Sequence, residues 1–285
     1  MQQRMPRDTL VVPAPAKVNL FLHVTGRRDD GYHLLESLFA LVDLADTVTL
    51  ARRDDRAIVR ARVVPGVAEH TDLAMRAAFA LREATGTPFG ASIAVEKRIP
   101  MGGGLGGGSS DAASVLLGLN RLWGLGLSRA ELAGIGVQLG ADVPFFVHGE
   151  NAIVRGIGEV IAPVSLPRQW LALALPAVQV PTATIFAAAE LTRSTRSAKI
   201  NVFSVGYGRN DLEPVAAARH PDVAAALAAL GRAAGNARMS ASGSSVCAAC
   251  ASAGTAREAV LALPAGLRGL VVRTLARHPL ASFAC

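Results

Sequence analysis

The sequence is poor in aromatic residues, cysteines and lysines, and each shortage narrows the kind of protein it can be. Aromatic residues make up 5% of the 285 residues and no long run of lysine or arginine occurs, which argues against a dedicated nucleic-acid-binding protein. Three cysteines cannot form a disulfide framework, so a reducing compartment is the simplest interpretation. Only three of the 29 basic residues are lysines, and the formal net charge of +7 suits an anionic substrate.

Signal-peptide and membrane-spanning patterns are also missing. Residues 1–10 carry charges without an apolar stretch behind them, unlike a secretory signal. The longest uncharged stretch, 169–189, is interrupted by Pro176 and Pro181, whereas a membrane span needs about 20 mostly apolar residues. We therefore expect a soluble, cytoplasmic protein with no membrane partner. Monomer and homodimer both remain open.

The hydrophobic content of 51% supports a large core, and the length corresponds to about two domains. The segment from Pro163 to Pro167, with a proline at each end, suggests a domain boundary between residues 1–163 and 164–285. Periodicity predicts strands at 17–24, 47–51, 58–63, 91–96, 151–155, 170–175, 246–251 and 269–275, and helices at 72–84, 111–122, 128–139, 186–191, 221–234 and 256–263. Because these elements do not alternate regularly, we expect an α+β fold in two lobes.

Local signals mark where several of these helices begin. Thr71 is the expected N-cap of the first helix, and Ser128 with Glu131 forms a capping box. Pro221 suits the first turn of the Ala-rich helix. The stretch 193–210 has no regular pattern and is expected to be irregular.

The strongest chemical signal is Met101-Gly-Gly-Gly-Leu-Gly-Gly-Gly-Ser-Ser110. Glycines allow close approach of the backbone to a ligand, and the helix that follows adds unpaired N–H groups and a positive dipole end. This combination predicts a cradle for a di- or triphosphate. A flexible linker does not explain the immediate start of a helix.

The residues around the glycines restrict which known type of phosphate-binding loop this can be. No Gly-Lys pair occurs, so a Walker A loop is excluded. Gly102, Gly104 and Gly107 match a dinucleotide fingerprint, but Arg121 and Trp123 occupy the region where an acidic residue is expected. A nicotinamide-dependent oxidoreductase and a non-catalytic phosphate-binding module remain alternatives to a kinase.

Several further motifs appear in order along nearly the whole chain. They are Pro15-Ala-Lys-Val-Asn-Leu-Phe-Leu22, Asp30-Gly-Tyr-His33, Leu35-Glu-Ser-Leu-Phe39, the Gly-rich segment 100–113, Leu139-Gly-Ala-Asp-Val-Pro-Phe-Phe146 and Pro181-Thr-Ala-Thr-Ile-Phe186. With these motifs the chain resembles the GHMP kinase superfamily, and most of all its members that phosphorylate a cytidine-diphosphate-linked methylerythritol in the non-mevalonate isoprenoid pathway. Another small-molecule kinase of the superfamily is the alternative. The resemblance implies a ribosomal-protein-S5-like N-terminal lobe, a ferredoxin-like C-terminal lobe, and ATP with Mg²⁺.

The resemblance also implies roles for individual residues. Lys17 and Asp142 become the catalytic pair, with Asp142 as the general base for the substrate hydroxyl. Ser109 or Ser110 becomes a candidate to hold magnesium on the nucleotide. The implied ATP-binding residues are Pro100, Met101, Gly102, Gly103, Gly104, Leu105, Gly106, Gly107, Gly108, Ser109 and Ser110. The implied substrate-binding residues are Asn19, Tyr32, His33, Thr182, Phe186 and Gly243, with Tyr32 stacking on the cytosine and Phe186 facing it.

One motif departs from the family pattern. The third glycine-rich segment reads Ser240-Ala-Ser-Gly-Ser-Ser245, with Ala241 where the family has its first glycine. Its contact with phosphate is therefore open. Cys247 and Cys250 have redox or zinc spacing, but no partner ligands accompany them, so we interpret them as structural. Lys97, Asp111 and His148 lie near the motifs and have no assigned role.

Overall fold

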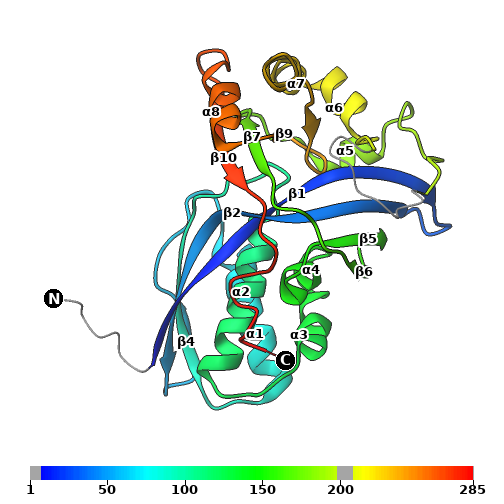
Figure 1. Ribbon diagram of the computed structural model, residues 1–285. Helices are drawn as coiled ribbons and strands as arrows, with labels where there is room; N and C mark the ends of the chain where they lie inside the picture. The colour runs from blue at the N-terminus through cyan, green and yellow to red at the C-terminus, as the bar shows by residue number, and fades with distance from the viewer. Residues whose placement is uncertain (1–7, 198–207, 285) are drawn as a thin grey trace.

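The computed structural model describes residues 8–197 and 208–284, which form two lobes, each with one β-sheet and adjacent helices (Figure 1). The first sheet has the order β3-β4-β2-β5-β6, and β1 pairs with β2 outside this path. Its strands are β1 (Thr9–Arg27), β2 (His33–Arg53), β3 (Ile58–Arg60), β4 (Gly90–Glu96), β5 (Ala152–Gly156) and β6 (Val160–Pro163). The predicted α+β class in two lobes is confirmed.

Strands β1 and β2 are much longer than the strands predicted at 17–24 and 47–51. The prediction fell short because both faces of these strands are buried. One face packs into the core of the first lobe, where Leu41 and Leu50 are fully buried. The other face packs on the second sheet through Val18 and Val42. Strands that are buried on both faces lack the alternation that marks a half-buried strand. For this reason residues 33–46 show no clear strand pattern in the sequence.

The helices of the first lobe pack on one another, and α1 and α2 also contact the sheet (Figure 1). They are η1 (Glu69–Thr71), α1 (Leu73–Thr85), α2 (Gly107–Leu122), α3 (Arg129–Gly136) and α4 (Val143–His148). The capping box of Ser128 and Glu131 is confirmed. The prediction of Thr71 as the N-cap of α1 is wrong, since the Asp72 carboxylate accepts the hydrogen bond from the Ala74 amide.

Two further boundaries in this lobe differ from the prediction. Helix α2 begins at Gly107 rather than Asp111, so the last two of the six glycines in the run are already helical. Helix α4 was not predicted, because Pro144 suggested an interruption. Proline is tolerated in the first turn of a helix, where its missing N–H has no intrahelical partner to lose.

The second lobe is an antiparallel sheet in the order β10-β7-β9-β8, with α7 and α8 packed against it. Its elements are β7 (Trp170–Leu175), α5 (Thr182–Phe186), α6 (Glu213–Arg219), α7 (Pro221–Ala234), β8 (Arg238–Met239), β9 (Val246–Cys250), α8 (Ala253–Leu261) and β10 (Arg268–Arg273). The predicted helix at 186–191 is wrong, since α5 ends at Phe186. The predicted irregular stretch 193–210 lies partly outside the described residues.

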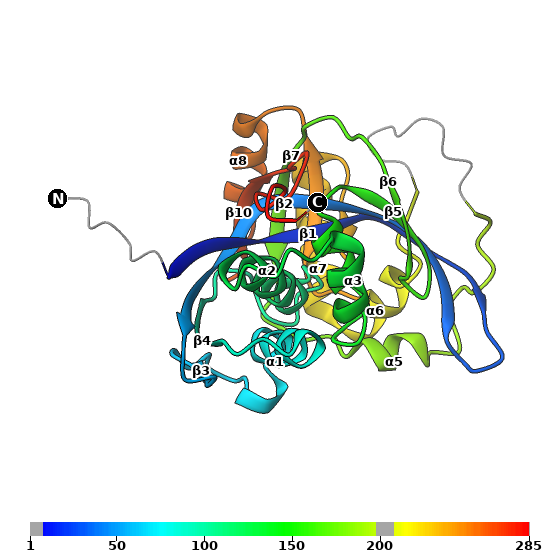
Figure 2. The same ribbon diagram turned by 90° about the horizontal axis from the view of Figure 1, so that it is seen from below.

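Along the chain, the interval between β6 and β7 separates the strands of the first sheet from those of the second. The division into domains at 1–163 and 164–285 stays a prediction. The end of the chain nevertheless returns from the second lobe to the first. After β10, residues 274–284 run back along the first lobe, where Leu280 joins its hydrophobic core (Figures 1 and 2). In the described part of the chain, no helix has the length and apolar character needed to cross a membrane.

Candidate active site

The glycine loop between β4 and α2 passes through a crowded part of the molecule. Gly104 and Gly106 have φ values of +73° and +72°, in the left-handed region that favours glycine. A Cβ atom on Gly104 would lie 2.4 Å from the carbonyl oxygen of Ser240, and one on Gly106 would lie 2.9 Å from Cζ of Phe146. These two positions therefore require glycine for conformation and for space.

The start of α2 directs backbone amides into the loop. Gly106 is the N-cap and supplies no side-chain hydrogen bond, so the first amides of this 16-residue helix remain available to an anion. The two serines of the motif differ. Ser110 is fully buried and its hydroxyl donates a 2.6 Å hydrogen bond to the carbonyl of Pro15. Ser109 lines the adjacent cavity and is the serine whose hydroxyl a nucleotide could meet.

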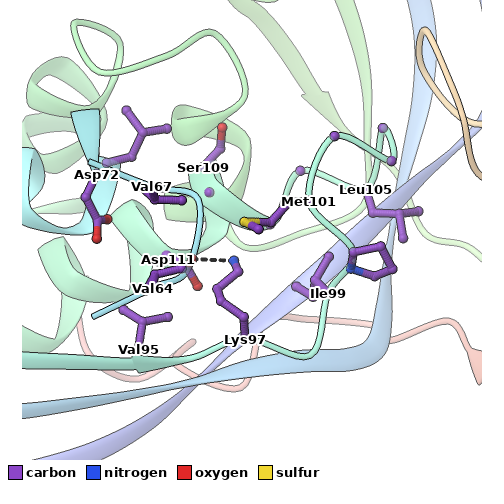
Figure 3. Close-up of a pocket in the computed structure, with 18 of the residues that line it drawn as sticks. Val64, Val67, Asp72, Val95, Lys97, Ile99, Met101, Leu105, Ser109 and Asp111 are labelled. Carbon is purple, nitrogen blue, oxygen red and sulfur yellow. Dashed lines mark hydrogen bonds and ion pairs between the residues drawn. The ribbon is translucent and has the colours of Figure 1, made fainter. Parts of the chain in front are cut away.

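One cavity, of about 380 Å³, lies on the α1 side of the loop (Figure 3). The loop glycines and Ser109 form one part of its wall. The opposite part is largely apolar and includes Val64, Val67, Leu73, Val95 and Ile99. Apolar walls beside an anion cradle are what an adenine base and its phosphates need. Every implied ATP-binding residue except Ser110 lines this cavity.

Lys97 lines this first cavity and lies between two carboxylates, and Figure 3 shows its ion pair with one of them, Asp111. Its ammonium donates hydrogen bonds to Asp46 at 2.5 Å and to Asp111 at 2.6 Å. Burial raises the pKa of Asp111 to about 7, against the opposing effect of Lys97 and with a further contribution from Asp46. The other carboxylate oxygen of Asp111, Oδ1, is buried and has no hydrogen-bond partner among the described residues.

A second cavity, of about 350 Å³, lies on the other side of the same loop. Gly102, Gly104 and Gly106 line both cavities, so only the loop backbone separates them. This second cavity brings together six residues that the sequence had singled out, from four separate parts of the chain: Lys17, Asn19, Asp142, Thr182, Phe186 and Gly243.

Lys17 and Asp142 face each other in the second cavity. The Lys17 ammonium lies 3.5 Å from Oδ2 of Asp142 and 4.3 Å from the ring centre of Phe39. Burial lowers the pKa of Lys17, and the neighbouring Asp142 opposes that effect. Asp142 is the N-cap residue of α4, yet its side chain makes no capping hydrogen bond and is 31% exposed. Its carboxylate is therefore open to the cavity instead of being used in the turn.

Asn19 holds Lys17 in place. Its Oδ1 accepts a 2.5 Å hydrogen bond from the Lys17 ammonium, and its Nδ2 donates to the hydroxyl of Ser37 at 2.8 Å. The Ser240 hydroxyl accepts a hydrogen bond from the backbone N–H of Asn19 and donates one to the carbonyl of Gly104. This chain of hydrogen bonds connects Lys17 to the glycine loop. A direct contact of Asn19 with substrate stays a prediction.

Phe186 lines the second cavity and is stacked on His33, with the ring centres 4.9 Å apart. His33 itself does not line the cavity. Arg193 donates hydrogen bonds to Nε2 of His33 and to the carbonyl of Phe186, and so connects both residues. Tyr32 is 62% exposed and does not line the cavity. The structure thus brings His33 to Phe186 but leaves Tyr32 at the surface.

Comparison with known proteins gives consistent matches over the whole chain. The model of the GHMP kinases N terminal domain matches residues 72–150, and that of the GHMP kinases C terminal region matches residues 191–269. A 4-diphosphocytidyl-2-C-methyl-D-erythritol kinase of Cupriavidus necator is 55% identical over 284 residues, covering 98% of this chain and 97% of that relative. The chain belongs to the GHMP kinase family. A kinase of the same name from Thiobacillus denitrificans is 54% identical over 271 residues, covering 95% of this chain and 97% of that relative.

Solved structures agree with this GHMP kinase assignment. A crystal structure of 4-(cytidine 5'-diphospho)-2C-methyl-D-erythritol kinase aligns with a TM-score of 0.82 and 36% identity, covering 93% of this chain and 99% of the other. A mevalonate kinase structure aligns with a TM-score of 0.66 and 14% identity, covering 93% and 99%. At that identity the second likeness shows the fold alone.

The third glycine-rich motif of this GHMP kinase lies against the loop. Ala241 has a φ of +51°, so it occupies the left-handed region in which glycine is favoured. Ala241 and Gly243 line the second cavity, and the carbonyls of Ser240 and Gly243 lie close to Gly104. The conformation thus explains why a glycine suits position 241. The alanine here adopts that conformation at some cost.

Sequence reasoning missed several residues that organise the kinase site. Asp46 and Ser37 lie on β2, which the sequence pattern did not resolve, and Arg193 lies in a stretch expected to be irregular. Lys97 and Asp111 were noticed only for their nearness to motifs. Their partners are far away in sequence, so no local pattern could connect them. His148 ends α4 and is exposed.

Proposed function

We propose that this kinase transfers the γ-phosphoryl group of ATP to the 2-hydroxyl of 4-diphosphocytidyl-2-C-methyl-D-erythritol, a step of the non-mevalonate pathway to isoprenoid precursors. The observation that carries the proposal is the pair of cavities on the two sides of one glycine loop. One has the anion cradle, and the other has a lysine and a carboxylate. The names of the relatives supply the acceptor.

The second cavity supplies the groups that the transfer needs. In the proposal, the Asp142 carboxylate accepts the proton of the attacking hydroxyl, because it is open to the cavity and uncommitted to the turn. The Lys17 ammonium neutralises charge on the reacting oxygen and on Asp142. Asn19 holds the ammonium, so little reorganisation is needed when charge develops. Phe186, which lines the cavity, and His33, which stacks on it, are proposed to bind the cytosine.

The first cavity is proposed to bind ATP. The amides of the loop and of the α2 N-terminus would hold the phosphates, and the apolar wall would hold the adenine. Magnesium fits this arrangement in a limited way. Ser109 offers a hydroxyl oxygen and Asp111 the carboxylate oxygen Oδ1 that is not bonded to Lys97, whereas Ser110 is bonded to Pro15. Mg²⁺ typically keeps several waters and binds substrate phosphates, and there it would neutralise phosphate charge. Because the reaction consumes ATP, we place it in the cytoplasm.

The decisive experiment is an acceptor comparison. ADP release would be measured with the cytidyl substrate, mevalonate, homoserine and galactose side by side, and with a cytidyl analogue that lacks the 2-hydroxyl. We expect turnover with the cytidyl substrate and none with its deoxy analogue. Faster turnover of another alcohol would assign a different acceptor. ATP binding without turnover of any acceptor would instead indicate a phosphate-binding module, and reduction of a nicotinamide cofactor would indicate an oxidoreductase.

A further inference from the structure

Asp142 owes its position to a very short helix. It precedes α4, which has only six residues, so any shift of α4 moves the carboxylate with it. A helix of that length has little stability of its own and depends on tertiary contacts. Because the Asp142 side chain makes no capping hydrogen bond, the local backbone does not fix it either. Contacts elsewhere on α4 must therefore determine how far Asp142 lies from Lys17.

One arginine binds the C-terminal end of α4, the end away from Asp142. Arg129, the first residue of α3, donates hydrogen bonds from Nη1 to the carbonyls of Val147 and His148. These are among the last carbonyls of α4, which have no partner within the helix and carry its negative dipole end. The start of α3 is itself fixed by the capping box. Arg129 thus connects the start of α3, which its capping box fixes, to the C-terminal end of α4.

The same guanidinium also holds the returning C-terminal segment, residues 274–284. Its Nη2 donates to the carbonyls of Leu280 and Ala281. The amide of His278 donates a 2.7 Å hydrogen bond to the carbonyl of Gly149, which terminates α4 with a φ of +73°. Figures 1 and 2 show this segment leaving β10 and ending beside α3. The end of α4 is therefore held between α3 and a segment that comes from the second lobe.

We propose that Arg129 is a positioning residue for Asp142, and that it acts by clamping α4 between α3 and the C-terminal segment. This inference rests on the proposed role of Asp142 as the base. Lys17 is held separately by Asn19 and by β1, so loosening α4 changes the 3.5 Å separation between Lys17 and Asp142. A substitution far from the chemistry that misplaces a catalytic group by about 1 Å can lower a rate by about 100-fold.

The test is a double-mutant cycle. Arg129→Lys and Arg129→Ala would each be made in the wild-type and in the Asp142→Asn background, and kcat measured with a radiolabelled ATP assay. If the loss of the clamp misplaces the Asp142 carboxylate by up to about 1 Å, we expect Arg129→Ala to lower kcat by about 10- to 100-fold in the wild type, with Arg129→Lys intermediate. In the Asp142→Asn background the same changes should cost less than about 2-fold, because the group being positioned is already lost. The KM for ATP should stay unchanged, since the first cavity lies across the loop.

Two controls separate positioning from folding. Leu230→Ala truncates a buried side chain in α7 and lowers the Tm without touching α4, so its kcat should remain normal well below the Tm. Gly149→Ala places a Cβ atom 2.9 Å from Cβ of His278 and disturbs the clamp from its other side. It should reproduce the kcat pattern of the Arg129 variants, and it also serves if Arg129→Ala fails to fold.

Equal losses of kcat in both backgrounds, or a normal kcat in folded Arg129→Ala, would overturn the clamp. A failure of the proposed function is visible separately. If Asp142→Asn alone retains wild-type kcat, Asp142 is not the base, whatever the Arg129 variants do.

Discussion

The two lysines that the structure describes hold carboxylates in opposite ways on the two sides of the glycine loop. Lys97 is bonded to Asp46 and Asp111 at 2.5 Å and 2.6 Å, and both carboxylates are buried. Lys17 lies 3.5 Å from Asp142, which is 31% exposed. A buried cluster with short ion pairs fixes the elements that carry it, whereas a looser pair at a cavity leaves its carboxylate free to meet a substrate. The difference separates a structural use of the same chemistry from the catalytic use that we propose for Lys17 and Asp142.

Burial also acts differently on the two clusters. It lowers the pKa of Lys17, so the ammonium depends on Asp142 for its charge. It raises the pKa of Asp111 to about 7, although Lys97 opposes the shift. At the first cavity, Asp46 adds a second negative charge beside one lysine, which also favours the protonated form of Asp111.

The largest expected effect comes from breaking the Lys17–Asp142 pair. Asp142→Asn keeps the size of the side chain but removes its ability to accept a proton. We expect kcat to fall by about 10²–10⁴-fold while ATP binding persists. Lys17→Ala should also lower kcat, and the double variant should lose less than the product of the two.

The measurements are kcat, ATP affinity and Tm on the same preparation. A folded Asn variant that keeps more than about a tenth of the wild-type kcat would contradict the base assignment. Phosphoryl transfer by charge stabilisation and positioning would remain possible in that case.

A crossed pair of substitutions tests whether the two cavities bind different substrates. Phe186→Ala should raise the KM for the cytidyl substrate by about 5- to 150-fold, the range expected for losing one base–aromatic stack. The KM for ATP should change little. Met101→Ala, on the nucleotide side of the loop, should show the reverse pattern. Steady-state kinetics with each substrate varied in turn checks both, and equal losses for both substrates would make Phe186 a core residue.

The Lys97 cluster predicts a pH dependence of stability. The pKa of Asp111 is about 7 in the folded protein, above its ordinary value, so the folded state binds this proton more tightly than the unfolded state. The contribution of Asp111 to the free energy of unfolding should then fall as pH rises from about 4 to about 7, by at most about 1.4 kcal/mol per pH unit. Asp111→Asn should remove this slope.

Urea unfolding of the wild type and Asp111→Asn from about pH 5 to about pH 8 measures the effect as a difference between the two proteins. Leu230→Ala, which changes no titratable group, is the control, and it should leave the slope as in the wild type. Parallel curves for wild type and Asp111→Asn would show that Asp111 stays ionised throughout.

The smallest expected effect is at Ala241. Because Ala241 has a φ of +51°, Ala241→Gly should relieve backbone strain and raise stability by less than about 1 kcal/mol, with kcat nearly unchanged. Ala228→Gly, at an exposed position of α7, is the matched control and should lower stability by about 1 kcal/mol. Chemical denaturation of both variants provides the comparison. A loss of stability at both positions would show that Ala241 carries no strain.

The sequence by itself determined the features that depend on neighbouring residues. The glycine run before a helix, the capping box at Ser128 and the Pro221 start of α7 are all local, and the structure has each of them. The motifs containing Lys17 and Asp142 also stood out, because their order along the chain resembles a known family. What these residues do together was an implication of that resemblance and not of their spacing.

Only the tertiary structure decided the rest. Burial of β2 on both faces hid its pattern, yet β2 supplies Asp46 to Lys97 and Ser37 to Asn19. The fold turned Ser110 toward Pro15 and left Ser109 at the cavity. It also carried the C-terminal segment back to Arg129. Such contacts join residues far apart in sequence, so their distances, burial and pKa values exist only once the chain has packed.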